Sequence, residues 1–227
     1  MIISFYRQDS AYRITLLKVF NMKVPLVYPK IPENSDKFLT KCVAFEKIDG
    51  TNMHWIWTPG VGWNCFGTRR TRFTLDDKGI SEFKTTHPEL EEAPHIFLRA
   101  FQPIVNNPPH ELILFTEFYG PNSFAGSHRA EDKKKLVLFD AMINGKLLSP
   151  SQFLDAFSTY NPPEEYEDEF DLPTLVYSGK YSGQFVEDVR KGKYPVNEGV
   201  IVKGVVDGEV FMTKIKTKSY LKRLEKR

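Results

Sequence analysis

The feature that most constrains this chain is a series of short strand-like segments joined by tight turns. Asp207-Gly208 separates two apolar, β-branched runs, and Asn144-Gly145 directly follows another such run. Both dipeptides favour two-residue hairpins, because Asn, Asp and Gly tolerate positive φ at low cost. Hairpin connections make neighbouring strands antiparallel. The segments predicted as strands are 53–57, 63–66, 111–119, 135–142, 199–206 and 210–216.

Helical segments are fewer, and some carry boundary signals of their own. Ser149 precedes Pro150, which places a capping hydroxyl before a proline at the first helical position. Ser182 is predicted to cap a second helix. The acidic, proline-containing stretch 161–173 is predicted to be a surface loop. The predicted helical segments are 88–105 (broken), 150–157, 183–192 and 219–227. Together with the strands, they predict an α+β fold with mostly antiparallel pairing.

The charge of the chain is small in total but unevenly distributed. The formal net charge is +2, and 41% of the 227 residues are hydrophobic, which is enough for a substantial core. Segment 161–171 carries six acidic residues and no base, whereas 213–227 carries seven bases and one acid. A near-neutral total therefore conceals a basic end, which is expected to face an anionic partner.

Cysteine usage and hydropathy predict a cytoplasmic protein without a membrane span. The two cysteines, Cys42 and Cys65, have neither CxxC nor metal-ligand spacing, which is typical of buried reduced thiols. No apolar run approaches the roughly 18 residues that a membrane helix needs. Residues 1–21 lack a signal-peptide cleavage site and are interpreted as an N-terminal extension whose order the sequence does not define. Residues 22–227 are predicted to form the functional domain.

Six short motifs, in a fixed order, carry a resemblance to a known family. They are EKIDGTN (46–52), RRTR (69–72), FTEFYGPNSFAG (115–126), LVLFDAM (136–142), EGVIVKG (198–204) and TKIKTKSY (213–220). This series resembles motifs I, Ia, III, IIIa, IV and V of the covalent nucleotidyltransferases, which comprise DNA ligases, RNA ligases and mRNA capping enzymes. The closest form is that of the phage-type RNA ligase 2 family. The resemblance implies two antiparallel sheets with flanking helices that enclose a nucleotide cleft.

The chemistry of these residue types agrees with that resemblance. A free lysine has a pKa of about 10.4, so Lys47 needs a lowered pKa or a nearby cation before it can act as a nucleophile. Glu198 and Asp49 offer hard oxygen ligands for Mg²⁺ or Mn²⁺. Lys214 and Lys216 lie two apart on a predicted strand and so share one face, which suits a triphosphate. Arg70 offers a planar donor fork for phosphate oxygens.

The resemblance assigns further roles. Lys47 would be the nucleophile, Phe139 would stack on the purine, and Glu117 would accept hydrogen bonds from the ribose. Glu46, Ile48 and Asn52 would complete the nucleotide site, and the basic tail would bind RNA through Lys218, Lys222 and Arg223. Structural alternatives stand beside these roles: a surface ion pair for Lys47, core packing for Phe139 and a structural carboxylate at Glu117.

Other candidate residues are expected to be structural. Lys203 is a secondary candidate that is either part of its motif or a solvated strand residue. The run 133–135 is expected to be a solvated group of charges. His54 is interpreted as an ordinary strand histidine, and Trp55 and Trp57 as core residues.

The resemblance therefore implies an ATP-dependent RNA ligase. Lys47 would take AMP from ATP, pass it to a 5′-phosphate RNA end, such as that of a nicked duplex, and so allow a 3′-hydroxyl to seal the strand. A minimal DNA ligase or capping guanylyltransferase is the first alternative, and an inactive nucleic-acid-binding module is the second. Asp49 does not discriminate cleanly, since many RNA ligase 2 members carry His there, whereas DNA ligases and capping enzymes carry Asp. The 11 residues after Lys216 leave no room for a C-terminal OB-fold, which favours the RNA ligase. A monomer is expected, in the cytoplasm or, for a viral protein, in the host cytoplasm.

Overall fold

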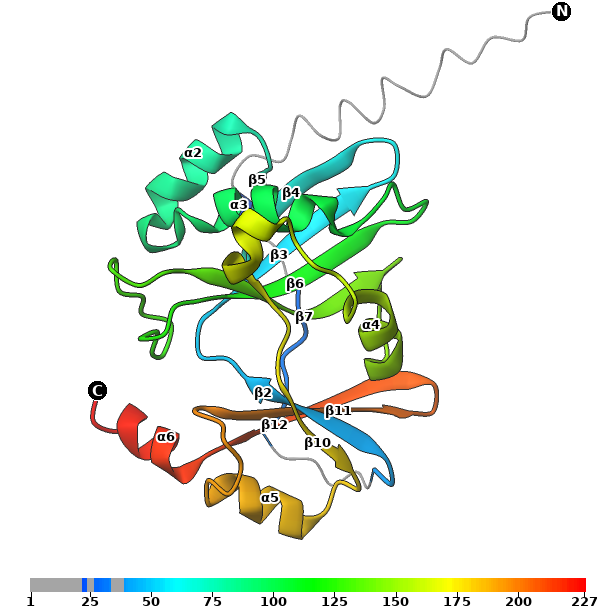
Figure 1. Cartoon of the computed structure of the whole chain (residues 1–227), viewed down its shortest axis with the longest axis vertical. Helices are drawn as coiled ribbons and strands as arrows, with labels where there is room; N and C mark the ends of the chain where they lie inside the picture. Colours follow the sequence, from blue (N-terminus) through cyan, green and yellow to red (C-terminus); the bar gives the residue numbers. More distant parts are fainter. Residues whose placement is uncertain (1–21, 24–26, 34–38) are drawn as a thin grey trace, which may run out of the picture.

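The protein is described by a computed structural model in which residues 22–23, 27–33 and 39–227 form two sheets with helices outside them (Figure 1). The larger sheet has eight strands in the order β1-β5-β4-β3-β6-β7-β8, with β9 paired beside β7. Its strands are β1 (Met22–Lys23), β3 (Thr51–Thr58), β4 (Gly62–Thr68), β5 (Thr71–Thr74), β6 (Leu112–Tyr119), β7 (Lys135–Ile143), β8 (Lys146–Leu147) and β9 (Phe170–Asp171). The predicted extension 1–21 lies outside the described residues.

The smaller sheet has four strands in the order β10-β2-β11-β12. They are β2 (Cys42–Lys47), β10 (Leu175–Gly179), β11 (Gly199–Val206) and β12 (Glu209–Lys216). Every described strand pair is antiparallel except β7 with β9, which is parallel. The predicted α+β class with two mostly antiparallel sheets is therefore confirmed.

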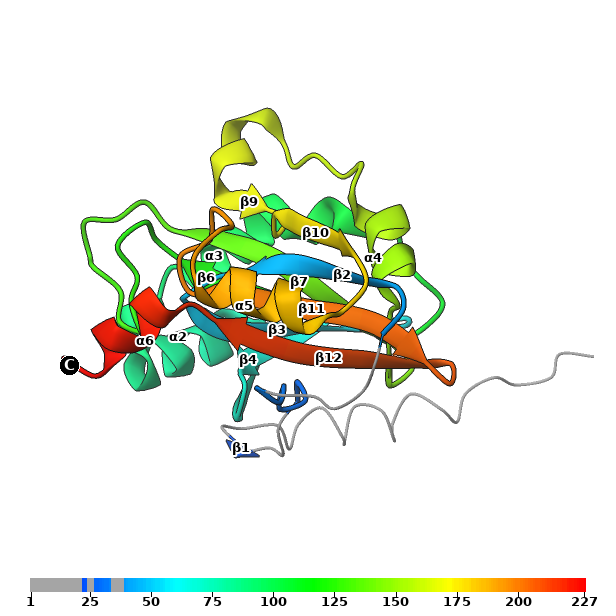
Figure 2. The same cartoon turned by 90° about the horizontal axis from the view of Figure 1, so that it is seen from below.

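Helices cover the outer face of each sheet, so the inner faces are left to meet one another. Figure 1 shows α2 and α3 above the larger sheet, and Figure 2 shows α5 against the outside of the smaller one. The helices are α2 (Asp77–Thr86), α3 (Ala93–Ile96), α4 (Pro150–Phe157), α5 (Gly183–Arg190) and α6 (Lys218–Leu224). Short 3-10 or π turns cover Pro88–Leu90, Phe97–Phe101, Gln102–Ile104 and Glu164–Glu169. No described helix is both long and apolar enough to cross a membrane.

Each layer has its own apolar core. Trp55 stacks on Phe97 at 4.1 Å between ring centroids, inside the cluster that joins the larger sheet to its helices. Phe185 of α5 packs in a second cluster with residues of the smaller sheet. A third cluster, which includes Tyr28 and Phe115, is separate from the first two, so the inner side of the larger sheet also buries apolar surface.

Most local predictions are confirmed, and their turn and cap chemistry is visible. Asn144 and Asp207 adopt φ of 48° and 52°, as their two-residue hairpins require. Ser149 caps α4 through a reciprocal capping box with Gln152, and the Ser182 hydroxyl accepts a hydrogen bond from Phe185 N at 3.2 Å. The predicted terminal helix begins earlier than expected, at Lys218, because Thr217 caps it.

One helix was missed, and two local predictions were wrong. Helix α2 was missed because Gly79 weakens its helical pattern, yet a Cβ at Gly79 would lie 2.0 Å from Thr74 O. The acidic stretch is not an irregular loop throughout, because it contains the 3-10 helix Glu164–Glu169 and strand β9. Arg99 also donates two hydrogen bonds, of 2.6 and 2.7 Å, to the Glu169 carboxylate. Lys134 is not solvated but buried, where it donates to the backbone carbonyls of Arg129 and Asp132.

Candidate active site

A cavity of about 410 Å³ opens between the two sheets, and strands of both contribute to its wall. This size lies within the usual range for sites that enclose a small organic ligand. Of the residues predicted from the sequence, ten line the cavity: Glu46, Lys47, Ile48, Asn52, Arg70, Glu117, Phe139, Glu198, Lys214 and Lys216. The structure thus gathers residues of five strands, β2, β3, β6, β7 and β12, and of the loops that contain Ile48, Arg70 and Glu198 around one space.

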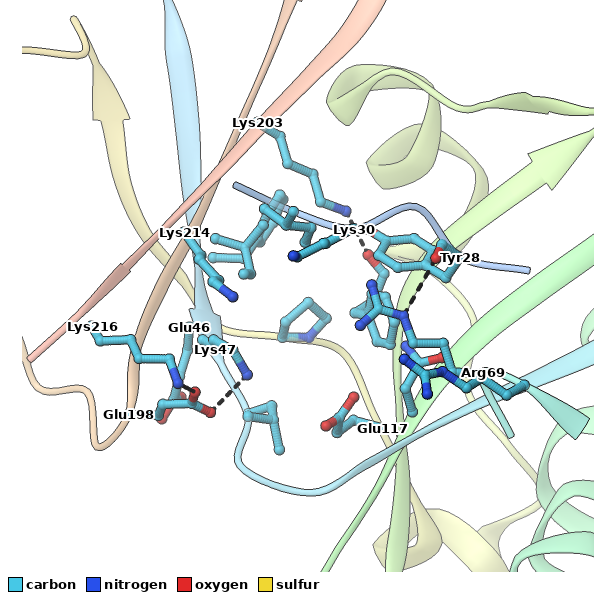
Figure 3. Close-up of a pocket in the computed structure, with 18 residues that line it drawn as sticks. Tyr28, Lys30, Glu46, Lys47, Arg69, Glu117, Glu198, Lys203, Lys214 and Lys216 are labelled. Atoms are coloured by element: carbon cyan, nitrogen blue, oxygen red, sulfur yellow. Dashed lines mark hydrogen bonds and ion pairs between the residues drawn. The ribbon is translucent and has the colours of Figure 1, made fainter. Parts of the chain in front are cut away.

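Lys47 occupies the last position of β2, beside a buried carboxylate. Lys47 pairs with Gly199 of β11, and its Nζ lies 2.7 Å from Glu198 Oε2. Lys216 of β12 also pairs with Gly199, and its Nζ lies 3.2 Å from Glu198 Oε1. Glu198, with a side chain only 2% exposed, therefore receives one ammonium on each oxygen (Figure 3).

Gly199 is required for this close approach of three strands. A Cβ at this position would lie 1.9 Å from Ile215 O and 2.8 Å from the Cα of Lys216. Any side chain would therefore push β12 away and separate Lys216 from Glu198. The Glu-Gly pair of the motif EGVIVKG thus has a steric basis in the sheet itself.

Carboxylates in the cavity oppose the effect of burial on the pKa of Lys47. Burial by itself would lower the pKa of Lys47, but Glu117, Glu198 and Asp49 outweigh it and hold the pKa above its ordinary value. Burial raises the pKa of Glu117 to about 7, with Lys47 opposing the shift and Glu198 adding to it. Without a ligand Lys47 is therefore an ammonium ion, so its amine must be released from these carboxylates before it can attack an electrophile.

The wall of the cavity offers apolar and polar contacts for a nucleotide. Phe139 is half-buried and meets the ring of Tyr28 edge-on, with centroids 5.2 Å apart. Asn52 also lines the cavity, and its buried Oδ1 has no hydrogen-bond partner among the described residues. An acceptor of this kind is costly to bury unless a ligand or water satisfies it.

Sequence reasoning missed one segment of the site, residues 27–33, which we term the strap. The strap crosses from the larger sheet, where Arg69 donates to Pro29 O at 2.8 Å, to the smaller sheet, where Lys214 N donates to Pro32 O at 2.9 Å. Its residues Tyr28, Lys30 and Ile31 line the cavity. Its prolines predicted only irregular structure, and no local pattern could indicate which surface it covers.

Lys203 is also a buried part of this region and not a solvated strand residue. Its side chain is 4% exposed, and its Nζ lies 2.9 Å from Asp140 Oδ2 on the facing sheet. The same Asp140 oxygen accepts a hydrogen bond from the Tyr28 hydroxyl at 2.8 Å. Lys203 therefore joins β11 to β7 and the strap.

Four predicted residues lie outside the cavity wall. Asp49 Oδ1 accepts hydrogen bonds from Ala125 N at 2.9 Å and from the Tyr220 hydroxyl at 3.0 Å, and Ala125 N also lies 3.1 Å from Oδ2. Lys218 forms an ion pair with Glu187 at 3.2 Å. Arg223 donates to Asn197 Oδ1 at 2.8 Å, whereas Lys222 is exposed.

Two antiparallel sheets that close on a cavity of nucleotide size define a domain of the nucleotidyltransferase type. The family model described as RNA ligase matches residues 40–216, which include all six motifs except the last four residues of the sixth. The chain therefore belongs to the RNA ligase family, and the resemblance seen in its motifs is confirmed. No curated protein sequence matches the chain.

Solved structures of an RNA ligase from Naegleria gruberi share the fold. The form with PPi has a TM-score of 0.53 at 15% identity, and the match covers 83% of this chain and 52% of that one. A mutant with ATP and Mn has a TM-score of 0.54 at 14% identity, with 89% and 62% covered. An apo mutant has a TM-score of 0.54 at 14% identity, with 94% and 62% covered. This chain thus spans 52% to 62% of the length of those ligases.

Proposed function

We propose that this protein is an ATP-dependent RNA ligase that works through a lysyl-AMP intermediate on Lys47. The observation that carries the proposal is the placement of the Lys47 amine in a nucleotide-sized cavity, 2.7 Å from the buried Glu198 carboxylate. A surface ion pair would not explain this arrangement, because the glutamate is 2% exposed and shared with a second lysine. Membership of the RNA ligase family supports the same conclusion.

In the first step, Lys47 Nζ forms a bond to the α-phosphorus of ATP as the bond to the β-phosphate oxygen breaks. Lysyl-AMP and pyrophosphate are the products, and the amine loses its proton. Lys214, Lys216 and Arg70 would bind the phosphate oxygens, which carry most of the charge of the substrate. Phe139 would stack on the adenine, and Glu117 would accept a hydrogen bond from the ribose. Glu46, Ile48 and Asn52 would complete the contacts around the nucleotide.

A divalent cation would fit this cavity only together with its nucleotide. The described residues contain no group of three or more His, Cys, Asp or Glu side chains that could hold a metal. Mg²⁺ is commonly held by one or two carboxylates plus substrate phosphates and water, and Glu198 is placed for that role. Mg²⁺ or Mn²⁺ would neutralise charge on the α-phosphate and favour the neutral lysine amine. The Naegleria ligase structure with ATP and Mn supports this pairing.

The later steps concern RNA. The 5′-phosphate oxygen of an RNA end would attack the phosphorus of lysyl-AMP, which frees Lys47 and leaves an AMP-capped end. The 3′-hydroxyl of the neighbouring strand would then attack the 5′-phosphate phosphorus, and AMP would leave as the phosphodiester forms. Lys222, an exposed cation of α6, is proposed to contact the RNA backbone.

The test is covalent labelling with α-³²P-ATP and Mg²⁺ or Mn²⁺, followed by denaturing electrophoresis. We expect a labelled protein band with ATP and no comparable band with GTP. Lys47→Ala should remove the label, because alanine has no amine. Lys47→Arg is the matched control, since it keeps a cation beside Glu198 and should also give no label. Label that survives in both variants would place the nucleophile elsewhere, and equal labelling by GTP would indicate a capping enzyme.

End joining is tested separately with nicked duplexes that carry a 5′-phosphate. Joining of RNA strands, with accumulation of AMP-capped ends at limiting metal, is expected for a ligase. A labelled protein that never transfers AMP to any RNA or DNA end would contradict the ligase assignment.

A further inference from the structure

Residues 48–50 link the strand that ends at Lys47 directly to β3 of the larger sheet. Lys47 is placed in the smaller sheet by its pairing with β11, and this short loop from β2 to β3 connects it to the larger sheet. Gly50 packs so closely on β6 that a Cβ there would lie 2.2 Å from Phe118 O. Its amide also lies 3.3 Å from Glu117 Oε1. The Gly50 end of the loop therefore packs directly on the larger sheet.

The middle of the loop is held by two donors that come from distant parts of the chain. Asp49 accepts the Ala125 amide and the Tyr220 hydroxyl, as described above. Tyr220 is 3% exposed, and its hydroxyl donates to Asp49 Oδ1 at 3.0 Å. Asp49 is half-buried, and a carboxylate that receives two such donors is strongly oriented.

The Ala125 amide belongs to a tight turn that packs on α6. In the turn, Phe124 and Ser127 exchange two backbone hydrogen bonds, and Ala125 adopts φ of 50°. The Phe124 ring meets the Tyr220 ring at 5.6 Å, and the Arg223 guanidinium lies over Phe124 at 5.0 Å. The turn follows β6 of the larger sheet, whereas α6 follows β12 of the smaller sheet, so their contact spans both.

We propose that α6 is a positioning element of the active site, in which Tyr220 holds Asp49 and, through it, the loop 48–50 that directly follows Lys47. This inference rests on the proposed function and adds residues to it. It also gives α6 a different role from the RNA clamp predicted from its basic sequence. Arg223 contacts Asn197 and the Phe124 ring, and Lys218 is paired with Glu187, so two of the three predicted RNA contacts of the helix already have partners within the protein.

The first test is Tyr220→Phe, which removes one hydroxyl and keeps the ring. The rate of Lys47 adenylylation at saturating ATP should fall about tenfold, in keeping with loss of a hydrogen bond to a charged group. The KM for ATP should stay within a factor of two, because Tyr220 does not line the cavity. Tyr160→Phe is the matched control: its hydroxyl donates to Ala100 O at 2.6 Å, away from the cavity, and its loss should leave the rate unchanged.

A double-mutant cycle tests whether Tyr220 acts through Asp49. Asp49→Asn should also lower the maximal rate, and Tyr220→Phe added to it should cost little more, because the two residues share one interaction. If the rate of the double mutant instead falls by the product of the two single-mutant factors, Tyr220 acts independently of Asp49 and the proposal is overturned.

Hydrogen exchange gives a readout that does not depend on activity. Amide exchange in segment 122–128 should quicken in Tyr220→Phe more than elsewhere in the protein, and should not change in this segment in Tyr160→Phe. Unchanged exchange together with an unchanged rate would overturn the role of α6. Absence of any label on the wild-type protein would instead contradict the proposed function, and the exchange result would still decide whether α6 holds the turn.

Discussion

Burial acts on Lys47 and His54 in the same direction, and their neighbours decide the outcome. Both side chains lose solvation, which lowers the pKa of a cationic group. Around Lys47, three carboxylates reverse this effect and raise its pKa. Around His54, which is fully buried, Arg72 adds to the effect of burial and the pKa falls to about 3. His54 is therefore neutral, and its Nδ1 is 3.0 Å from Thr68 O, as suits a structural strand residue.

This shift of the His54 pKa predicts a loss of stability in acid. Below pH 6.5, the ordinary pKa of histidine, His54 binds a proton in the unfolded chain but stays neutral in the folded chain. The free energy of unfolding should therefore fall as the pH drops from 6.5 towards 3. At about 1.4 kcal/mol per pKa unit, the upper bound for this group is roughly 5 kcal/mol. Urea unfolding of the wild type and of His54→Leu at pH 7.5 and 4.5 checks this prediction. The variant should lose less stability between the two pH values, and equal losses would contradict it.

Strand β11 illustrates how one element serves both fold and site. It pairs with β2 on one side and β12 on the other, so its first residues stand between Lys47 and Lys216. Glu198 immediately precedes the strand, and Gly199 opens it. The strand therefore sets the spacing between the two ammonium groups and their shared carboxylate.

Gly199→Ala should disrupt this spacing. The added methyl would overlap Ile215 O, so we expect destabilisation of about 3 kcal/mol and loss of covalent labelling. Gly183→Ala on α5 is the control, because a Cβ at Gly183 meets nothing within 4 Å. Thermal unfolding and labelling of both variants provide the measurement. A Gly199→Ala protein with normal stability and labelling would show that the strands can move apart without consequence.

At the scale of the whole molecule, a buried ion pair ties the two sheets together. Lys203 of the smaller sheet and Asp140 of the larger sheet are 4% and 0% exposed, and Tyr28 of the strap joins them. The pair lies beside the cavity, so the relative position of the sheets and the shape of the cavity depend on the same contact. Charged groups that are buried this deeply stay ionised only when each is paired with a group of opposite charge.

Lys203→Met should therefore cost about 3–5 kcal/mol, because it leaves the Asp140 carboxylate buried without its cation. Adding Asp140→Leu should restore much of the loss by removing the orphaned charge. Lys133→Met is the matched control, since Lys133 pairs with Asp168 on the surface and should contribute at most about 1 kcal/mol. Urea unfolding of the three proteins measures these differences. Equal costs for Lys203→Met and Lys133→Met would mean that the buried pair does not link the sheets.

The sequence by itself determined the local structure and the family. Turns at Asn144 and Asp207 and the caps at Ser149 and Ser182 depend on residues at most four apart, so their chemistry is readable in order along the chain. The six motifs were readable for the same reason, because each is a short run within one strand or loop. Lys47 and Glu198 could both be predicted as active-site residues, although the sequence does not show how close together they lie.

Only the tertiary structure decided which groups meet. Lys47 and Glu198 are 151 residues apart, Asp49 and Tyr220 are 171 apart, and Tyr28 and Asp140 are 112 apart. Lys134 and Lys203 carry the same side chain as any solvated lysine, and only their surroundings bury them. The strap and α6 likewise have sequences that fit an irregular segment and an RNA-binding tail. Burial and partnership are properties of the packed chain, because they depend on what the other strands place nearby.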